Sequence, residues 1–220
     1  MFGIVVALKA EAKSLLNIAK IKKEFNLADK PAYLCEIGGK ECVLAISGIG
    51  KVSAALTTQL LIDNYNLEFI LNYGTCGGTN DNVKITNYYI VEKCCQYDFD
   101  LTELEDVPLG YIQEYDTVFF NTCTDKIDFL PMSTLASADK FTNKQEDIQT
   151  INQMGCSICD MEGAAIAQVC TSNSTPLYII KGISDVAGNG TNPEQFFENL
   201  QTVGDNFPSI IIKAIKEISK

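Results

Sequence analysis

Arginine and histidine are both absent from this sequence of 220 residues, so all 17 basic side chains are lysines. Because histidine is missing, the carboxylates of aspartate and glutamate are the groups best suited to acid–base chemistry near neutral pH. Because arginine is missing, the chain lacks the planar side chain that binds an oxyanion in a bidentate manner. Any acid–base chemistry is therefore expected from carboxylates.

Runs of positive charge and long apolar stretches are missing as well. The chain carries 28 acidic residues, a formal net charge of −11 and no basic run, which argues against nucleic acid or an anionic membrane as a partner. No stretch approaches the roughly 20 apolar residues needed to span a bilayer. The N-terminus lacks the basic flank and cleavage site of a signal peptide. We expect a cytoplasmic protein that binds neither nucleic acid nor membrane.

The nine cysteines are odd in number, and several lie in apolar segments, such as Cys35 and Cys42. Since no export signal is present, reduced thiols in a cytosol are the expected state. Residues Cys156 and Cys159 form a C-x-x-C pattern, for which a metal or redox role is the alternative. No second pair and no histidine accompany it, so a structural zinc site has few ligands. We expect these thiols to pack in the core and to bind no metal.

Short apolar runs alternate with helical patterns along the chain, without a linker or an internal repeat. We expect strands near residues 2–8, 32–36, 41–47, 67–73, 86–93, 111–120, 132–138, 156–160 and 177–183, and helices near residues 9–20, 51–65, 143–153, 162–172 and 193–219. The last helix contains Gly204 and Pro208, and we expect a bend or a break there. The pattern predicts one α/β domain over residues 1–220, with a mixed central sheet surrounded by helices.

Three carboxylates follow three of the expected strands. Asp185 ends the apolar run that starts at Ile179, and Glu162 follows the strand that ends at Asp160. Glu11 lies in the first turn of the first helix. Each also has a structural explanation, since aspartate often caps turns and glutamate is favoured at helix N-termini. Because open α/β folds bind their ligands at the carboxyl edge of the sheet, the three acids together indicate a pocket.

Further segments carry recognisable motifs, and they span nearly the whole chain. They are Gly3 to Glu11, Ser47-Gly48-Ile49-Gly50-Lys51-Val52, Asn72-Tyr73-Gly74-Thr75-Cys76-Gly77-Gly78, Ser137 to Asn143, Asp160-Met161-Glu162 and Ser184-Asp185-Val186-Ala187. In this order they resemble the nucleoside phosphorylase and nucleosidase superfamily, and within it the bacterial hydrolases of 5′-methylthioadenosine and S-adenosylhomocysteine. Each motif alone is weak, but the ordered set is specific for the superfamily.

The resemblance implies a division of labour among the carboxylates. Asp185 would give or share a proton at purine N7, which requires a raised pKa. Glu162 would accept hydrogen bonds from the ribose hydroxyls and place negative charge near the developing sugar cation. Glu11 would act as the general base that activates water. Asp185 and Glu11 are therefore the expected catalytic residues.

The resemblance also implies a set of substrate-binding residues. Met161 would pack on the sugar, Phe141 would stack on the purine, and the backbone of Thr142 would pair with its edge. The remaining expected contacts are Thr75 and Gly77 in the glycine-rich loop, Ser184 beside the catalytic acid, Lys181, and an apolar lining of Ile49, Leu8 and one of Phe196 or Phe197. Thr75 replaces a serine, Lys181 replaces an arginine and Asp160 replaces a glutamate of the family pattern. For Phe141 and the apolar lining, ordinary core packing is the alternative.

The resemblance and the missing arginines together favour water over phosphate as the nucleophile. We expect hydrolysis of the N-glycosidic bond of 5′-thio-substituted adenosines, with a purine nucleoside as the small-molecule partner and no cofactor. The alternatives are phosphorolysis, with Lys51 or Lys181 holding phosphate, and a non-catalytic member that only binds nucleosides. Pockets of the superfamily are usually completed by a partner subunit, so the resemblance also implies a homodimer.

Overall fold

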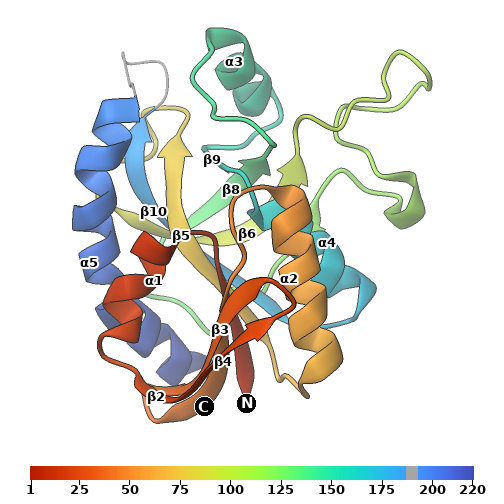
Figure 1. Ribbon diagram of the computed structural model, residues 1–220. Coiled ribbons are helices and arrows are strands. Elements are labelled where there is room, and N and C mark those ends of the chain that lie inside the picture. The colour runs from red at the N-terminus through yellow and green to blue at the C-terminus, as the bar shows by residue number, and fades with distance from the viewer. Residues whose placement is uncertain (187–192) are drawn as a thin grey trace.

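The computed structural model describes residues 1–186 and 193–220. For residues 193–198 only the backbone is described. A mixed sheet lies at the centre of the molecule and helices pack on both sides of it (Figure 1), as the predicted α/β class requires. The elements in chain order are β1 (Phe2–Val6), α1 (Lys9–Leu16), β2 (Lys20–Leu27), β3 (Lys30–Ile37), β4 (Lys40–Ile46), α2 (Lys51–Asn64), β5 (Ile70–Gly78), β6 (Tyr88–Gln96), a 3-10 turn (Gln113–Tyr115), β7 (Phe120–Asn121), β8 (Met132–Ser137), α3 (Gln145–Gln153), β9 (Ile158–Asp160), α4 (Gly163–Ser172), β10 (Leu177–Val186) and α5 (Pro193–Ile218).

The strand order brings the ends of distant strands together. The sheet runs β10-β6-β8-β9-β5-β1-β4-β3-β2, and β10 also pairs with β5. This extra pairing closes β5, β9, β8, β6 and β10 into a ring, while β1, β4, β3 and β2 continue as an open sheet. Because β1, β4, β5 and β10 are parallel, their carboxyl ends lie at one edge of the sheet. Ligand sites of open α/β sheets form at such an edge.

Apolar side chains cover both faces of the central strands, and this fixes the sheet between two helical layers. Strand β1 is buried along its whole length. Val5 packs in the cluster that includes α2 and α4, whereas Ile4 and Val6 pack in the cluster that includes α1 and α5. The alternation follows from the two-residue period of a strand. The strand ends that carry the carboxylates are therefore held by packing on both sides.

Strand β2 was not predicted, and its place in the sheet explains why. In its sequence Lys-Ile-Lys-Lys-Glu-Phe-Asn-Leu, four of the eight residues are charged and only Phe25 and Leu27 at its end pack on the core, so the apolar alternation is short. It forms the edge of the sheet by pairing with β3, and Lys22 adds an ion pair with Glu41 at 2.7 Å. Lysines are common on edge strands because they discourage pairing with other chains.

The strand predicted at residues 111–120 is wrong. Ile112 and Thr117 form only an isolated bridge around a 3-10 turn, and Asp116 adopts a left-handed conformation with φ 49°. Only Phe120 and Asn121 join the sheet, as β7. The preceding segment projects from the body of the molecule (Figure 1).

A bend or a break was predicted near Pro208, and the break is absent, since α5 is continuous from Pro193 to Ile218. Proline has no N–H to donate to the carbonyl four residues earlier, which is that of Gly204. The Ser14 hydroxyl of α1 donates to this carbonyl at 2.7 Å and satisfies it. A contact between two helices thus replaces the hydrogen bond that the proline removes. No helix in the described part of the chain is long and apolar enough to cross a bilayer.

Candidate active site

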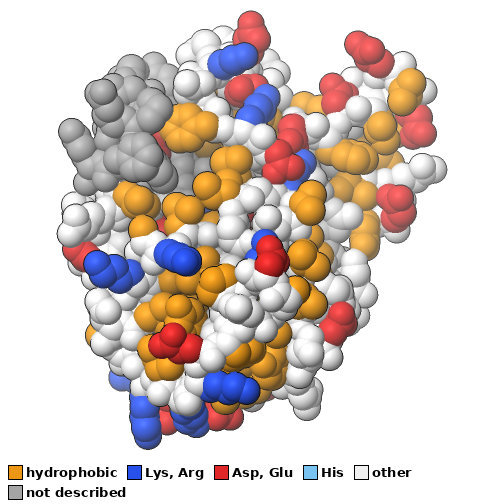
Figure 2. Space-filling model, viewed as in Figure 1, with side chains coloured by type: hydrophobic (Ala, Val, Ile, Leu, Met, Phe, Trp, Pro, Cys, Tyr) orange, Lys and Arg blue, Asp and Glu red, His pale blue; other side chains and the backbone are white. Residues whose placement is uncertain are grey.

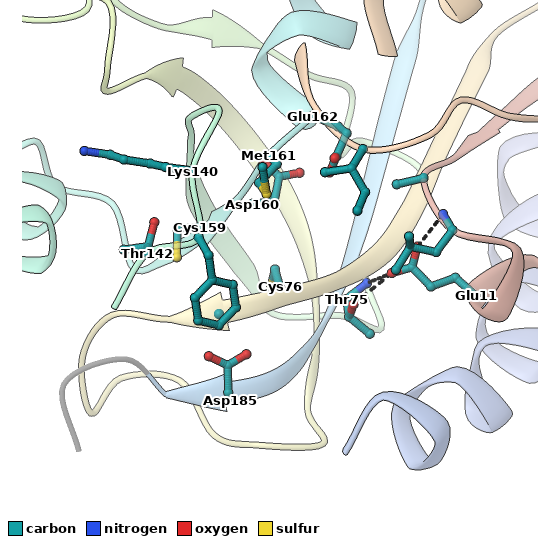
Figure 3. A pocket seen from close by; sticks show the side chains of 15 residues that line it. Glu11, Thr75, Cys76, Lys140, Thr142, Cys159, Asp160, Met161, Glu162 and Asp185 are labelled. Atoms are coloured by element: carbon teal, nitrogen blue, oxygen red, sulfur yellow. Dashed lines mark hydrogen bonds between the residues drawn. The ribbon is translucent and has the colours of Figure 1, made fainter. Parts of the chain in front are cut away.

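A pocket opens at the carboxyl edge of the sheet, where β1, β5, β9 and β10 end (Figure 3). Its lining residues are Ala7, Leu8, Glu11, Ile49, Thr75, Cys76, Gly77, Lys140, Phe141, Thr142, Cys159, Asp160, Met161, Glu162 and Asp185. In Figure 3, Thr142 and Asp185 lie toward one end of the pocket, and Glu11 and Thr75 lie at the other. Glu162 and Met161 lie between them.

Glu11 is held rigidly at one end of the pocket. It is 3% exposed, and its Oε1 accepts hydrogen bonds from the Thr75 backbone N–H at 2.7 Å and the Thr75 hydroxyl at 2.8 Å. Its Oε2 accepts the Leu8 N–H at 3.1 Å. A Cβ at Gly74 would lie 3.0 Å from Oε1, so glycine allows β5 to approach the carboxylate. Burial raises the pKa of Glu11, although the Thr75 hydrogen bonds and the charge of Lys181 oppose this.

Glu162 lies at the N-cap of α4 and is 8% exposed. Its Oε1 accepts the Gly50 N–H at 2.8 Å, which links the end of β9 to the turn before α2. Burial and the charge of Asp160 raise the pKa of Glu162 to about 7, against the opposing charge of Lys181. This carboxyl therefore changes its protonation state near neutral pH.

Asp185 lies near the end of β10, just after a register shift in the pairing with β5. It is 3% exposed, and its Oδ1 accepts the Ser184 hydroxyl at 2.7 Å. Burial raises the pKa of Asp185, while the Ser184 hydrogen bond lowers it. Among the described residues, only the Ser184 hydroxyl bonds this carboxylate, and Asp185 lines the pocket. A carboxyl with a raised pKa in this position can donate a proton to a base.

Lys181 forms a buried ion pair with Asp160, which lines the pocket beside the three acids. The Lys181 Nζ lies 2.9 Å from Asp160 Oδ2, and the two side chains are 3% and 2% exposed. Asp160 also accepts hydrogen bonds from the Ser137 hydroxyl at 2.5 Å and the Gly163 N–H at 2.9 Å. Burial lowers the pKa of Lys181, but the charges of Asp160 and Glu162 outweigh this and raise it. Lys181 thus supplies a fixed positive charge to a cluster of carboxylates.

The structure brings most of the expected site residues to one pocket. Those that line it are Asp185, Glu11, Glu162, Met161, Phe141, Thr142, Thr75, Gly77, Ile49 and Leu8. Ser184 and Lys181 instead lie behind the wall, bonded to Asp185 and Asp160. The alternative of core packing fails for Phe141 and Ile49, which are 41% and 57% exposed. The expectation for Phe196 or Phe197 concerns side chains outside the described residues.

Several lining residues were not singled out from the sequence: Ala7, Cys76, Lys140 and Cys159. Ala7, Cys76 and Lys140 lie within the motif segments and Cys159 directly precedes one, and this position was the signal available for them. The hydroxyl of Thr142 is hydrogen-bonded to Tyr97 Oη at 2.6 Å, so this side chain is already engaged by the protein. The expected contact between the backbone of Thr142 and the purine edge stays a prediction.

The cysteines are free thiols. The sulfur atoms of Cys35 and Cys42 lie 3.5 Å apart, and those of Cys95 and Cys156 lie 3.7 Å apart, well beyond a disulfide bond length of about 2.05 Å. Cys156 thus faces Cys95, whereas Cys159 lines the pocket. Among the described residues, no group of three or more potential metal ligands is present.

The sequence family follows from comparison with known proteins. Residues 1–216 match the model of the Phosphorylase superfamily. The chain belongs to this superfamily. A 5′-methylthioadenosine/S-adenosylhomocysteine nucleosidase of Buchnera aphidicola from Schizaphis graminum is 34% identical to it over 99% of the chain and 97% of the relative.

Solved members of the phosphorylase superfamily share its fold. The nucleosidase of that name from Colwellia psychrerythraea, in complex with adenine, superposes with a TM-score of 0.90 at 27% identity, covering 98% of this chain and 94% of that one. Futalosine hydrolase of Helicobacter pylori superposes with a TM-score of 0.90 at 25% identity, covering 98% and 97%. Two hydrolases with different names are thus about equally similar to this chain in fold and in sequence.

Proposed function

We propose that the protein hydrolyses the N-glycosidic bond of 5′-methylthioadenosine and S-adenosylhomocysteine, releasing adenine and the thioribose product. The observation that carries the proposal is the convergence of Asp185, Glu162 and Glu11 on one pocket in a chain without arginine. The similarity to nucleosidases of this name along the whole chain supports the choice of substrate.

Asp185 acts on the leaving base. Departure of the purine leaves negative charge on its ring, and protonation of a ring nitrogen neutralises that charge. Burial raises the pKa of Asp185, so its protonated form persists to a higher pH than that of an exposed aspartate. Phe141 and the backbone of Thr142 hold the purine at the same end of the pocket. Turnover is expected to fall as pH rises through the pKa of Asp185.

Glu162 acts on the sugar. It lies across the pocket from Asp185, beside Met161 (Figure 3), and its Oε1 is oriented by the Gly50 N–H. In its ionised form it accepts hydrogen bonds from the ribose hydroxyls and stabilises the positive charge that develops as the bond breaks. Met161 offers an apolar surface to the ring. The pKa of about 7 means that this function is lost on the acidic side of neutrality.

Glu11 acts on water. Thr75 occupies Oε1 with two hydrogen bonds, whereas Oε2 accepts only the Leu8 N–H from the described residues and has capacity for a water molecule. Its raised pKa makes it a stronger base than an exposed glutamate. Lys181 favours the ionised form of Glu11 that the reaction requires.

Phosphorolysis is the less favoured reaction because the two candidate lysines are already paired. Lys51 Nζ lies 2.6 Å from Asp98 Oδ1, and Lys181 Nζ lies 2.9 Å from Asp160 Oδ2. Neither lysine lines the pocket. Binding phosphate there would require breaking an ion pair and placing an anion among carboxylates, which is electrostatically unfavourable.

Product analysis tests the proposal. The purified protein is incubated with 5′-methylthioadenosine in phosphate-free buffer, with futalosine in parallel, and the products are separated by chromatography. We expect adenine and a reducing sugar from the first substrate. A sugar 1-phosphate formed only when phosphate is added would establish phosphorolysis, and binding without turnover would establish a nucleoside sensor. Faster release of base from futalosine would reassign the substrate.

We also propose that the protein is a homodimer and that it functions in the reducing cytoplasm, where its free thiols persist. Val52 and Leu56 lie one turn apart on α2 and are 79% and 45% exposed, and Leu104 on the projecting segment is 82% exposed. Figure 2 shows apolar side chains on that segment, above the α2 side of the molecule. These exposed apolar side chains support the proposal that the partner subunit packs on α2 and on the projecting segment.

Sedimentation velocity tests the dimer. We expect Val52→Lys to shift the protein toward the monomer. Met132→Lys is the matched control, because Met132 is 60% exposed but lies at the start of β8, away from the carboxyl edge. A monomeric wild-type protein, or equal behaviour of the two variants, would exclude α2 as the interface.

A further inference from the structure

A second cavity adjoins the candidate active site. It has a volume of about 430 Å³ and opens to solvent between the start of α1, the turn before β3 and the end of β4. The two cavities share Ala7, Leu8 and Ile49 as lining residues. A ligand that extends past Leu8 and Ile49 therefore leaves the first cavity and enters the second.

The charges of the two cavities differ. Carboxylates dominate the first, whereas the second carries Lys9, Lys30 and Asp29. Lys30 is 15% exposed and its Nζ lies 3.4 Å from Asp29 Oδ2, while Asp29 is 75% exposed. Lys9 is exposed and makes no ion pair with the described residues. Two ammonium groups beside one carboxylate complement a ligand that itself carries both signs of charge.

The order of groups along the first cavity sets the direction of a bound nucleoside. This step rests on the function proposed above. Asp185 takes the base and Glu162 takes the ribose, so the 5′ substituent is directed away from Asp185. Leu8, whose N–H bonds Glu11 at the opposite end, lies on that path and joins the two cavities. The apolar side chains at the junction suit a thioether.

We propose that the second cavity binds the α-amino-acid end of a long 5′-thio substituent, such as that of S-adenosylhomocysteine. Lys30 and Lys9 pair with the carboxylate of this group, and Asp29 pairs with its ammonium. Three further carbon atoms carry these charges roughly 5 Å beyond the sulfur. A methylthio group ends at Leu8 and Ile49 and does not reach the lysines. The second cavity thus stabilises only the substrate that carries the amino acid.

Steady-state kinetics on paired substrates tests this subsite. Lys30→Met keeps the aliphatic stem and removes the charge. Because partly exposed ion pairs are weak, we expect KM for S-adenosylhomocysteine to rise about 3- to 10-fold, with kcat changed by less than about 2-fold. KM for 5′-methylthioadenosine and for the uncharged 5′-butylthioadenosine is expected to stay within about 2-fold of wild type. Lys20→Met on the exposed edge strand β2 is the control and should change none of these values.

The outcomes separate this proposal from the function on which it rests. Equal changes in KM for all three substrates, or no change for S-adenosylhomocysteine, would overturn the subsite. A parallel change for 5′-butylthioadenosine would show that Lys30 contributes apolar contact, not charge. If the wild-type protein turns over none of the three, the proposed function fails. Calorimetric binding of S-adenosylhomocysteine to wild type and Lys30→Met then decides the subsite independently.

Discussion

Replacing Glu162 with glutamine is expected to stabilise the ligand-free protein at alkaline pH. The pKa of Glu162 is raised from its ordinary value of 4.5 to about 7 because the carboxyl is buried beside Asp160. The folded protein therefore holds a proton that the unfolded chain releases between these two pH values. Stability falls as pH rises through that window, and the full penalty is present above pH 7. Glutamine keeps the shape and the acceptor for the Gly50 N–H without the charge.

The magnitude follows from the shift in pKa. One pKa unit corresponds to about 1.4 kcal/mol, so the advantage of Glu162→Gln in unfolding free energy should grow by about 2 to 3 kcal/mol between pH 5 and pH 8. Urea denaturation at fixed protein concentration measures this growth. Glu103→Gln, on the exposed projecting segment, is the matched control and should show none. A constant difference between wild type and Glu162→Gln across this pH range would refute the reasoning.

The same variant should lose function. The ionised carboxylate binds the ribose hydroxyls, so Glu162→Gln should raise KM and lower kcat together. In the wild type, kcat/KM should fall on the acidic side with a midpoint near the pKa of about 7, since this quantity reports ionisations of the free enzyme. In Glu162→Gln the limb with this midpoint should disappear, and only the ionisation of Glu11 should then limit kcat/KM on the acidic side. Glu162 would then destabilise the folded protein while being required for catalysis, which is a trade-off between stability and function.

Three further substitutions test the other groups. Asp185→Asn should lower turnover about 10²- to 10⁴-fold with little change in unfolding free energy, because it removes a general acid. Near-wild-type turnover in a folded variant would show that Asp185 only caps a turn. Glu11→Gln should leave the affinity for a non-cleavable thioadenosine analogue nearly intact, as measured by calorimetry, while turnover falls by orders of magnitude. A loss of affinity as large as that of Glu162→Gln would contradict the assignment of Glu11 as the base. Lys181→Met should lower the free energy of unfolding, measured with denaturant, by about 3–5 kcal/mol, because it leaves Asp160 buried without its cation. Adding Asp160→Asn should restore part of this stability. If the losses of the two single variants simply add in the double variant, the pair is not coupled.

Local pattern was sufficient for the fold class. The apolar run of β1, the 3.6-residue pattern of α3 and the small residues at the start of α4 each follow from backbone geometry within a few residues. Where the local signal was weak or misleading, prediction failed. Strand β2 exists because β3 offers it a partner, and α5 continues through Pro208 because Ser14 satisfies the carbonyl of Gly204. Both outcomes depend on residues far away in the sequence.

The same division holds for the site. The sequence by itself determined which carboxylates follow the ends of the strands, since strand direction and motif order place Glu11, Glu162 and Asp185 at one edge of the sheet. Only the tertiary structure decided their protonation and partners. Lys181 pairs with Asp160, and the pKa of Glu162 rises to about 7. Both effects come from burial and from charges that are close in space but far apart in the sequence, so spacing along the chain does not predict them.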